Sequence, residues 1–187
     1  MPYYFKKMKY LFTILFIYSL SAISDPIDKI IHIVPAIEET PQVISKGDAA
    51  DDPAIWLNKL NQNRSLVFGT DKRSGIYTYN LKGEKIGYTE IGDVNNIDVR
   101  TMNITDDDNK DIGSYSFIFA SNRTTNTLDI WAYKDTNIDK AVKDNNFEIS
   151  KEPYINAKAN MVVYGVCAGI DAKFGLVAFL TEDEGPK

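Results

Sequence analysis

Three aspartates, Asp48, Asp51 and Asp52, lie within five positions and run through Pro53 into the apolar segment 54–56. Carboxylate oxygens are ligands that a hard cation such as Ca²⁺ prefers, and such an ion takes about six to eight oxygens. A carboxylate cluster fixed by a proline where a loop enters a strand is therefore a reasonable calcium site. The same residues are typical of a solvated acidic turn, because Asp and Pro are common turn formers. Both interpretations stay open on this segment alone.

Two cations, Lys72 and Arg123, follow the ends of two similar apolar segments. Such cations bind phosphate or carboxylate groups, and a guanidinium can do so through two hydrogen bonds at once. Between them, residues 93–98 are rich in oxygen, and Asn96 and Asp98 could ligate a metal ion or cap a turn. Cations and carboxylates around one opening would suit a phosphate ester bridged by metal ions, which neutralise the ester and activate water.

An internal repeat must position these residues. Residues 65–70 are apolar and end in a hydroxyl residue, and a polar residue and Lys72 follow; residues 116–121 show the same pattern before Arg123. Each copy continues into a second strand-like segment, at residues 75–81 and 127–133. The offset of 51 residues is within the span of one propeller blade, and a third copy begins at residues 176–181. Equivalent blade positions meet at one mouth of a propeller, so we expect both cations to face one pocket.

The fold class that these features predict is all-β. Tyr, Phe, Ile, Val and Thr are plentiful and favour strands. Residues 81–84 predict a hairpin turn in which Gly83 adopts a positive φ. Antiparallel strands at this spacing predict a β-propeller or a sandwich. Because a propeller ring has at least about four blades and residues 46–187 hold about three, we expect this segment to be a partial propeller whose missing blades lie downstream.

The first residues predict export. Residues 1–24 have the three parts of a secretory signal peptide, with Lys6, Lys7 and Lys9 before an apolar run and small residues after it. The run at residues 10–20 is shorter than the roughly 18 apolar residues that a spanning helix needs. We therefore expect no membrane anchor after cleavage, and a periplasmic or extracellular protein. Residues 25–45 are expected to form an N-terminal strand or linker.

Net charge limits the classes of binding partner, and cysteine content limits disulfide formation. Loss of three lysines with residues 1–24 moves the formal net charge from −5 to about −8. An acidic exported protein is a poor nucleic-acid binder, although bridging cations would let it bind an acidic small molecule. The one cysteine, Cys167, cannot form an internal disulfide, and we expect it to be a small buried residue in the strand-like segment 161–167.

Five separated motifs resemble those of the β-propeller phytases. They are Asp-Ala-Ala-Asp-Asp-Pro-Ala-Ile-Trp at 48–56, Lys-Arg-Ser-Gly at 72–75, Asn-Asn-Ile-Asp-Val-Arg at 95–100, Ser-Asn-Arg at 121–123 and Tyr-Gly at 164–165. Their order and approximate spacing follow that family over residues 46–185. The resemblance implies a six-bladed, calcium-dependent enzyme that removes phosphate from phytate, myo-inositol hexakisphosphate, outside the cell or in the periplasm. About three of the six blades would lie in this chain.

The resemblance also implies roles for single residues. The calcium-binding residues would be Asp51, Asp52, Asn96 and Asp98, with Asp48 beside them. The residues that bind substrate phosphate would be Lys72, Arg73, Arg123 and Tyr164. Water activated by calcium would attack the ester, without a protein nucleophile. The sequence departs from the family at Asp183, where members carry a phosphate-binding lysine, and in its length, since further carboxylate ligands belong to later blades.

Two functions follow as alternatives. In the first, the chain is the front part of a phytase, and later residues complete the enzyme. In the second, it is a non-catalytic, incomplete propeller module that binds calcium or inositol phosphates. The repeat breaks off inside a blade, which favours the first, whereas a terminal repeat with its own capping strand would favour the second.

Overall fold

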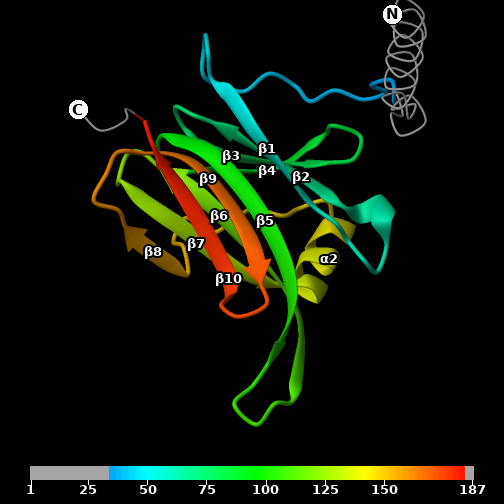
Figure 1. Ribbon diagram of the computed structural model, residues 1–187. Coiled ribbons are helices and arrows are strands. Elements are labelled where there is room, and N and C mark those ends of the chain that lie inside the picture. The colour runs from blue at the N-terminus through cyan, green and yellow to red at the C-terminus, as the bar shows by residue number, and fades with distance from the viewer. Residues whose placement is uncertain (1–33, 184–187) are drawn as a thin grey trace, which may run out of the picture. The chain divides into compact units, whose positions relative to one another are not determined.

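The computed structural model describes residues 34–183, whose strands form three antiparallel sheets (Figure 1). The first sheet has the order β1 (Ala50–Trp56), β2 (Leu66–Asp71), β3 (Gly75–Asn80) and β4 (Lys85–Glu90). The second has the order β5 (Val94–Thr105), β6 (Asp111–Asn122), β7 (Thr127–Lys134) and β8 (Ile155–Lys158). The third pairs β9 (Val163–Asp171) with β10 (Gly175–Glu182).

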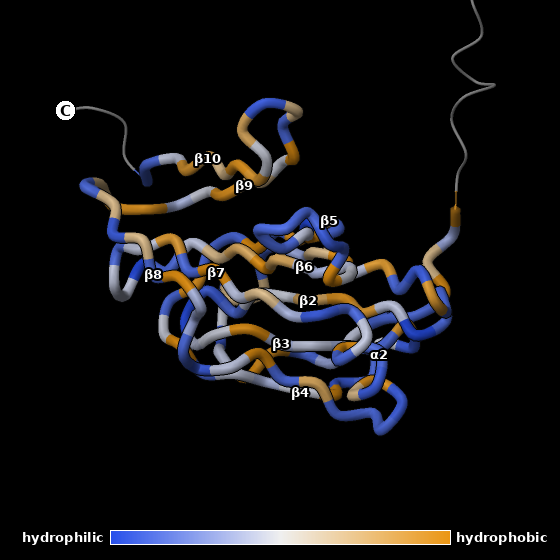
Figure 2. Tube along the Cα trace, turned by 90° about the horizontal axis from the view of Figure 1, so that it is seen from below, coloured by the Kyte–Doolittle hydropathy of each residue, from blue (hydrophilic) through white to orange (hydrophobic). Residues whose placement is uncertain are grey.

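The sheets stack face to face in chain order. Figure 2 shows β9 and β10 on one side of the second sheet, and β3 and β4 on the other. Contacts join β1 and β2 to β5, and β5 and β6 to β9. Sequential antiparallel sheets that pack in this way are blades of a propeller-like fold. The predicted all-β class is confirmed, while the total of six blades stays a prediction.

The internal repeat corresponds to the second strand of each sheet, namely β2, β6 and β10. The three copies occupy equivalent places, as the pairing of the first strand with the second strand of each sheet shows. At the same end of the three sheets, Ala50 pairs with Asp71, Val94 with Asn122, and Val163 with Glu182. A register shift lies beside each of these pairs. The third copy predicted at residues 176–181 is therefore confirmed as β10.

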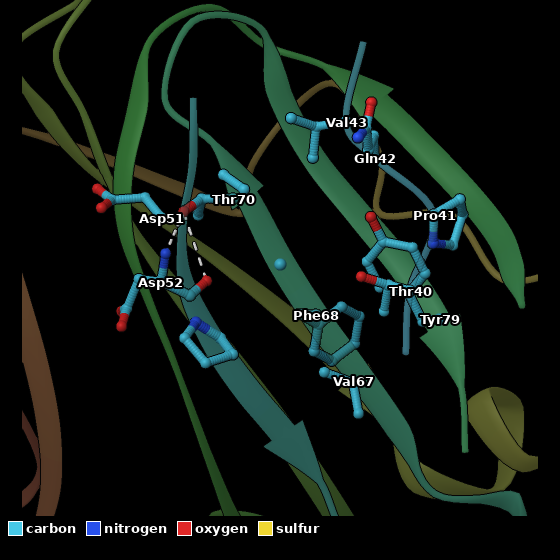
Figure 3. Close-up of a pocket in the computed structure, with 13 residues that line it drawn as sticks. Thr40, Pro41, Gln42, Val43, Asp51, Asp52, Val67, Phe68, Thr70 and Tyr79 are labelled. Atoms are coloured by element: carbon cyan, nitrogen blue, oxygen red, sulfur yellow. Dashed lines mark hydrogen bonds between the residues drawn. The ribbon is translucent and has the colours of Figure 1, made fainter. Parts of the chain in front are cut away.

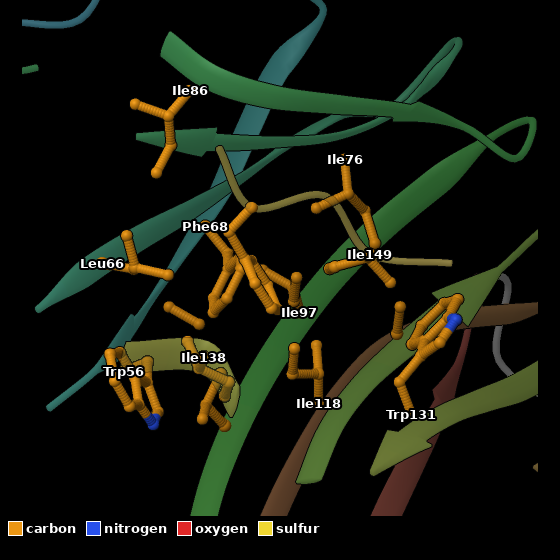
Figure 4. Packing of buried hydrophobic residues seen from close by; sticks show 14 of the residues in the cluster. Trp56, Leu66, Phe68, Ile76, Ile86, Ile97, Ile118, Trp131, Ile138 and Ile149 are labelled. Atoms are coloured by element: carbon orange, nitrogen blue, oxygen red, sulfur yellow. The ribbon is translucent and has the colours of Figure 1, made fainter. Parts of the chain in front are cut away.

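The main core lies between the first and second sheets (Figure 4). Its largest fully buried members include Trp56, Phe68 and Ile118. A smaller cluster between the second and third sheets contains Phe119, Leu128, Val166 and Ala168. Ile118 and Phe119 are neighbours on β6 and enter different clusters, because successive side chains of a strand point to opposite faces. The middle sheet is thus buried on both sides.

The hairpin between β3 and β4 forms as predicted. Gly83 has a φ of +75°, and its amide donates to the carbonyl of Asn80 at 3.0 Å. A Cβ at Gly83 would lie 2.1 Å from the carbonyl oxygen of Glu39. Glycine is therefore needed both for the turn and for the close passage of the N-terminal segment.

A short helix, α2 (Asp135–Lys143), follows β7 and was not predicted. Ile138 and Val142 join the main core from one face of this helix. Asp139 accepts hydrogen bonds from Asn58 Nδ2 at 2.6 Å and from Arg64 Nε at 2.7 Å. The carboxylate thereby connects α2 to the loop between β1 and β2, which contains the 3-10 turn η2 (Gln62–Arg64).

The expectation that Cys167 is buried is wrong, because its side chain is exposed. Its neighbours Val166 and Ala168 pack against the second sheet, so the alternation along β9 turns Cys167 to the other face. There it pairs in register with Phe179 of β10, which is 65% exposed. The outward face of the third sheet is therefore partly apolar.

The predicted signal peptide, residues 1–24, lies outside the described residues. The boundaries predicted at 25–45 and 46–187 likewise stay predictions, although residues 34–49 contain neither helix nor strand. Between residues 34 and 183, no helix is both long and apolar enough to cross a membrane.

Candidate functional site

A hydroxyl near the end of the second strand of each sheet binds the first strand of the same sheet. The amides of Asp52, Asn96 and Gly165 donate to the hydroxyl oxygens of Thr70, Ser121 and Thr181, at 2.9, 3.0 and 2.9 Å. These bonds lie beside the register shifts, where an amide of the first strand has lost its partner in the ladder. The hydroxyl satisfies that amide, which explains why each copy of the repeat ends in Thr or Ser.

Two of these hydroxyls also connect one sheet to the next. Thr70 Oγ1 donates to the carbonyl of Asn95 at 2.8 Å, and Ser121 Oγ donates to the carbonyl of Tyr164. Asn95 and Tyr164 stand at the same position of their first strands, one residue before the amide described above. The repeat thus fixes the inner strands of consecutive sheets side by side.

The residue two positions after each of these hydroxyl residues is held by a repeated bond between backbone groups. The amides of Lys72, Arg123 and Asp183 donate to the carbonyls of Ala49, Asp93 and Val162, at 2.9, 2.7 and 3.0 Å. Each bond attaches this position to the residue just before the first strand of its own sheet. Lys72, Arg123 and Asp183 are therefore equivalent, and their side chains leave the backbone at the same end of three stacked sheets.

These equivalent side chains line one cavity of about 410 Å³. Its lining residues are Asp48, Lys72, Arg73, Asp93, Asn95, Arg123, Tyr164 and Asp183. The structure thus brings together the four residues predicted to bind phosphate, and adds Asp48 from the predicted calcium set. Three cations and three carboxylates line the cavity, so its formal charge is about zero.

Lys72 is the more enclosed of the two ion-paired cations, with 17% of its side chain exposed. Its Nζ lies 2.7 Å from Asp48 Oδ2 and 3.8 Å from Asp51 Oδ1. The hydrogen bond from Lys72 lowers the pKa of Asp48 from its ordinary value. The same bond raises the pKa of Lys72. Both groups are therefore charged at neutral pH.

Arg123 is held between a carboxylate and an aromatic ring. Its Nη2 lies 2.6 Å from Asp183 Oδ2, and its guanidinium carbon lies 5.6 Å from the centre of the Tyr164 ring. An arginine above an aromatic ring is attracted to its face, so Tyr164 orients the guanidinium. Each of the two equivalent cations, Lys72 and Arg123, thus has a carboxylate partner within the described residues.

Asp51 and Asp52 line a neighbouring pocket of about 370 Å³ under the N-terminal segment (Figure 3). Figure 3 shows both carboxylates pointing away from Phe68 and Tyr79, which form the apolar side of this pocket. Asp52 Oδ2 accepts the amide hydrogen of Ile97 at 3.0 Å, which connects β1 to β5. Asp51 approaches the cavity through its contact with Lys72.

The structure does not place all predicted calcium ligands together. Asp98 Oδ1 accepts hydrogen bonds from the Val99 amide and from Arg100, while its Oδ2 accepts one from the Ala168 amide at 2.8 Å. Asn96 Oδ1 accepts a hydrogen bond from Asn95 Nδ2 at 2.9 Å. The side-chain oxygens of these two residues therefore serve the protein itself. Their predicted role as metal ligands stays a prediction.

The chemistry of the remaining oxygens agrees in part with a hard cation. Asn95 Oδ1 is buried, lines the cavity and has no hydrogen-bond partner within residues 34–183. Asp48 and Asp51 lie on the same side, around Lys72. In the described part of the chain, however, no three Asp, Glu, His or Cys side chains converge closely enough to hold a metal ion. The described residues thus present oxygens of the type that a hard cation prefers, without forming a complete metal site.

Three lining residues were not predicted as site residues. Asp93, Asn95 and Asp183 reach the cavity because they stand at or beside repeated positions. The signal in the sequence was the repeat, which makes Asp183 the third counterpart of Lys72 and Arg123. Its position after the third copy was recognised from the resemblance, but its negative charge kept it out of the predicted site residues.

Comparisons with known proteins agree with the motifs. A family model described as Phytase matches residues 10–173. The chain is also similar to the 3-phytase of Bacillus subtilis (strain 168), with 37% identity over 120 residues. That alignment covers 63% of this chain and 30% of the relative. The chain therefore spans less than a third of the length of the curated relative that it matches.

Proposed function

This chain belongs to the phytase family, and on that premise we propose that it supplies one side of a site for phosphate monoesters of myo-inositol hexakisphosphate. The proposed reaction is calcium-dependent hydrolysis by activated water, completed by residues beyond this chain. One observation carries the proposal: the equivalent cations Lys72 and Arg123 reach one cavity from consecutive sheets. Two cations on separate sheets suit a ligand that carries several phosphate groups.

Phosphate recognition is assigned to four side chains. The Arg123 guanidinium can bind two phosphate oxygens at once, while Lys72 and Arg73 offer further positive charge in the same cavity. The Tyr164 ring, whose centre lies 5.6 Å from the guanidinium carbon, attracts the arginine to its face. Because Lys72 and Arg123 are each paired with a carboxylate, a phosphate group must replace that carboxylate or arrive with a cation.

Calcium is proposed as the cofactor, with Asp48, Asp51, Asp52, Asn96 and Asp98 as its predicted ligands. Asp48 and Asp51 are the best placed, because Asp48 lines the cavity and Asp51 lies 3.8 Å from Lys72 Nζ. When bound, calcium would neutralise charge on the ester and activate water. Asp52 would contribute through the oxygen that does not accept the Ile97 amide. Phosphate oxygens and further protein ligands would complete the shell.

The proposal extends to location and assembly. Residues 1–24 would direct export to the periplasm or the medium, and the exported protein would act on phytate there. The partly apolar outward face of the third sheet, with Phe179 and Cys167, would be covered by a further blade. Neither nucleic acid nor a membrane is expected as a partner of the mature protein.

A second candidate is a module that binds calcium or inositol phosphates without hydrolysis. It is favoured by one observation, the neutral balance of three cations and three carboxylates in the cavity. A binding module would retain ligands in such a site without the additional groups that hydrolysis needs. Both candidate functions use the same residues, and they differ only in whether phosphate is released.

The experiment combines binding and turnover. Binding of inositol hexakisphosphate is measured by calorimetry with the wild type, Arg123→Ala and the control Lys82→Ala, which removes a charge at the exposed turn after β3. We expect Arg123→Ala to weaken binding by about 10- to 100-fold, since hydrogen bonds to charged groups contribute about 1.5–3 kcal/mol. Lys82→Ala should bind like the wild type.

Phosphate release is then measured with calcium and with a chelator, for this chain and for a protein extended downstream of Lys187. Calcium-dependent release that Arg123→Ala removes would support the phytase. Binding without release in the extended protein would leave the binding module. If Arg123→Ala keeps both binding and phosphate release, the assigned site is refuted.

A further inference from the structure

Asp183 carries a charge opposite to that of its structural counterparts. The repeated amide bonds place it where Lys72 and Arg123 stand in the preceding sheets. Its side chain enters the same cavity, yet it brings a carboxylate to a set of positions that otherwise carry cations. That carboxylate lies 2.6 Å from Arg123 Nη2.

A phosphate oxygen bound to Arg123 would need the place that Asp183 occupies. Charge-assisted hydrogen bonds from a guanidinium to a carboxylate or to a phosphate have similar lengths, about 2.7–2.9 Å. A carboxylate that already accepts from Nη2 would also repel a phosphate dianion in the same cavity. About a third of each side chain is exposed, so the pair can open without a change in the sheets.

We infer that Asp183 is a residue that lowers phosphate affinity, an internal anion that competes with phosphate groups for Arg123. The inference rests on the proposed function of the cavity. A ligand with a single phosphate gains little from exchanging one anion for another at Arg123. A ligand with several phosphates also reaches Lys72 and Arg73 once Asp183 has been displaced, so it binds in spite of the competition.

Isosteric variants of this chain test the inference. The probes are inorganic phosphate and inositol hexakisphosphate, titrated by calorimetry in the presence of a chelator. We expect Asp183→Asn to bind both about three- to tenfold more tightly, the effect of removing a partly exposed ion pair and a like charge. The matched control is Glu182→Gln, which removes the same charge from the neighbouring exposed residue outside the cavity lining.

A double-mutant cycle identifies the mechanism. If Asp183 acts by competing for Arg123, then Asp183→Asn gives no gain in a protein that also carries Arg123→Gln. An equal gain in that background, an equal gain from Glu182→Gln, or no gain in Asp183→Asn would overturn the inference. Weaker binding by Asp183→Asn when calcium is added would overturn it as well, since Asp183 would then be a metal ligand.

Failure of the proposed function gives a different result. In that case neither probe binds to the wild type or to Asp183→Asn, or Arg123→Gln binds both as tightly as the wild type does. Circular dichroism of each variant confirms that the sheets are intact. The inference fails alone when Arg123→Gln weakens binding but Asp183→Asn has no effect.

Discussion

Replacement of Thr70 by valine tests whether the repeated hydroxyl holds consecutive sheets together. Thr70 is 2% exposed, and its Oγ1 accepts the Asp52 amide at 2.9 Å while donating to the Asn95 carbonyl at 2.8 Å. Valine has nearly the same shape and lacks both functions. Thr70→Val therefore removes one bond within the first sheet and one bond to the second sheet, with little change in packing.

The expected loss of unfolding free energy is about 2–3 kcal/mol, because a buried polar group left without a partner costs about 1–3 kcal/mol. The two residues differ in burial, since Asp52 is only partly buried whereas Asn95 is buried. The share of the Asp52 amide belongs at the low end of that range, and the share of the buried Asn95 carbonyl lies higher. Thr70→Ser keeps the hydroxyl and should lose about 1 kcal/mol, the contribution of one buried methyl group.

The measurement is urea unfolding followed by the fluorescence of Trp56 and Trp131, which are both buried in the main core. With a slope of about 2 kcal/mol per M, the midpoint of Thr70→Val should fall by about 1–1.5 M and that of Thr70→Ser by about 0.5 M. Equal midpoints for the two variants would show that the methyl group, and not the hydroxyl, stabilises the junction. That result would refute the structural reason given for the repeat.

Two further predictions concern the frame around the site. Hydrogen bonds from Asn58, and then from Arg64, keep the pKa of Asp139 below its ordinary value of 3.8. The stability that this gives is present above about pH 4 and is lost as pH falls through the lowered pKa, so the urea midpoints of wild type and Asp139→Asn should draw together as the pH falls below about 4. Gly75→Ala places a Cβ 2.1 Å from a carbonyl oxygen of β4 and should cost at least about 3 kcal/mol in thermal unfolding. Gly47→Ala, which meets nothing within 4 Å, should cost only about 1 kcal/mol, the strain of its positive φ, and a similar loss for both would contradict the steric reason.

The repeat could be predicted because each of its parts has a local cause. Alternating apolar residues specify a strand, and a hydroxyl residue near its end answers an amide that the register shift leaves without a partner. The same pattern in residues 65–70, 116–121 and 176–181 therefore produced the same three bonds. The repetition alone was therefore enough to predict that Lys72 and Arg123 line one cavity.

The helix α2 could not be predicted in the same way. Its nine residues include only Ile138 and Val142 as large apolar side chains, and they lie in a polar stretch between two strands. A helix this short is marginal by itself, since helix nucleation is costly. It forms because those two side chains complete the main core and because Asp139 binds the loop of a neighbouring sheet.

The carboxylates of the site show a different limit of sequence reasoning. The residue types of Asp52 and Asp98 indicated possible oxygen ligands for a metal ion. They did not indicate which of these oxygens would accept hydrogen bonds from the protein itself. Asp98 lies in a long strand whose neighbours offer an arginine and two amides, and these engage both of its oxygens. The bond from the Ala168 amide joins β9 to β5, two strands far apart in the sequence, so spacing along the chain cannot reveal it.

The balance of charge in the cavity connects the proposed cofactor to the proposed competition at Arg123. Each ion pair holds a cation of the proposed phosphate site, and Asp48 in the Lys72 pair is also one of the proposed calcium ligands. A polyphosphate arriving with calcium could open the pair of Lys72 and Asp48, because the lysine would turn to phosphate and the Asp48 carboxylate to the metal, while Asp183 would only be displaced from Arg123. A neutral cavity of this kind favours the metal complex of an anion over the anion alone.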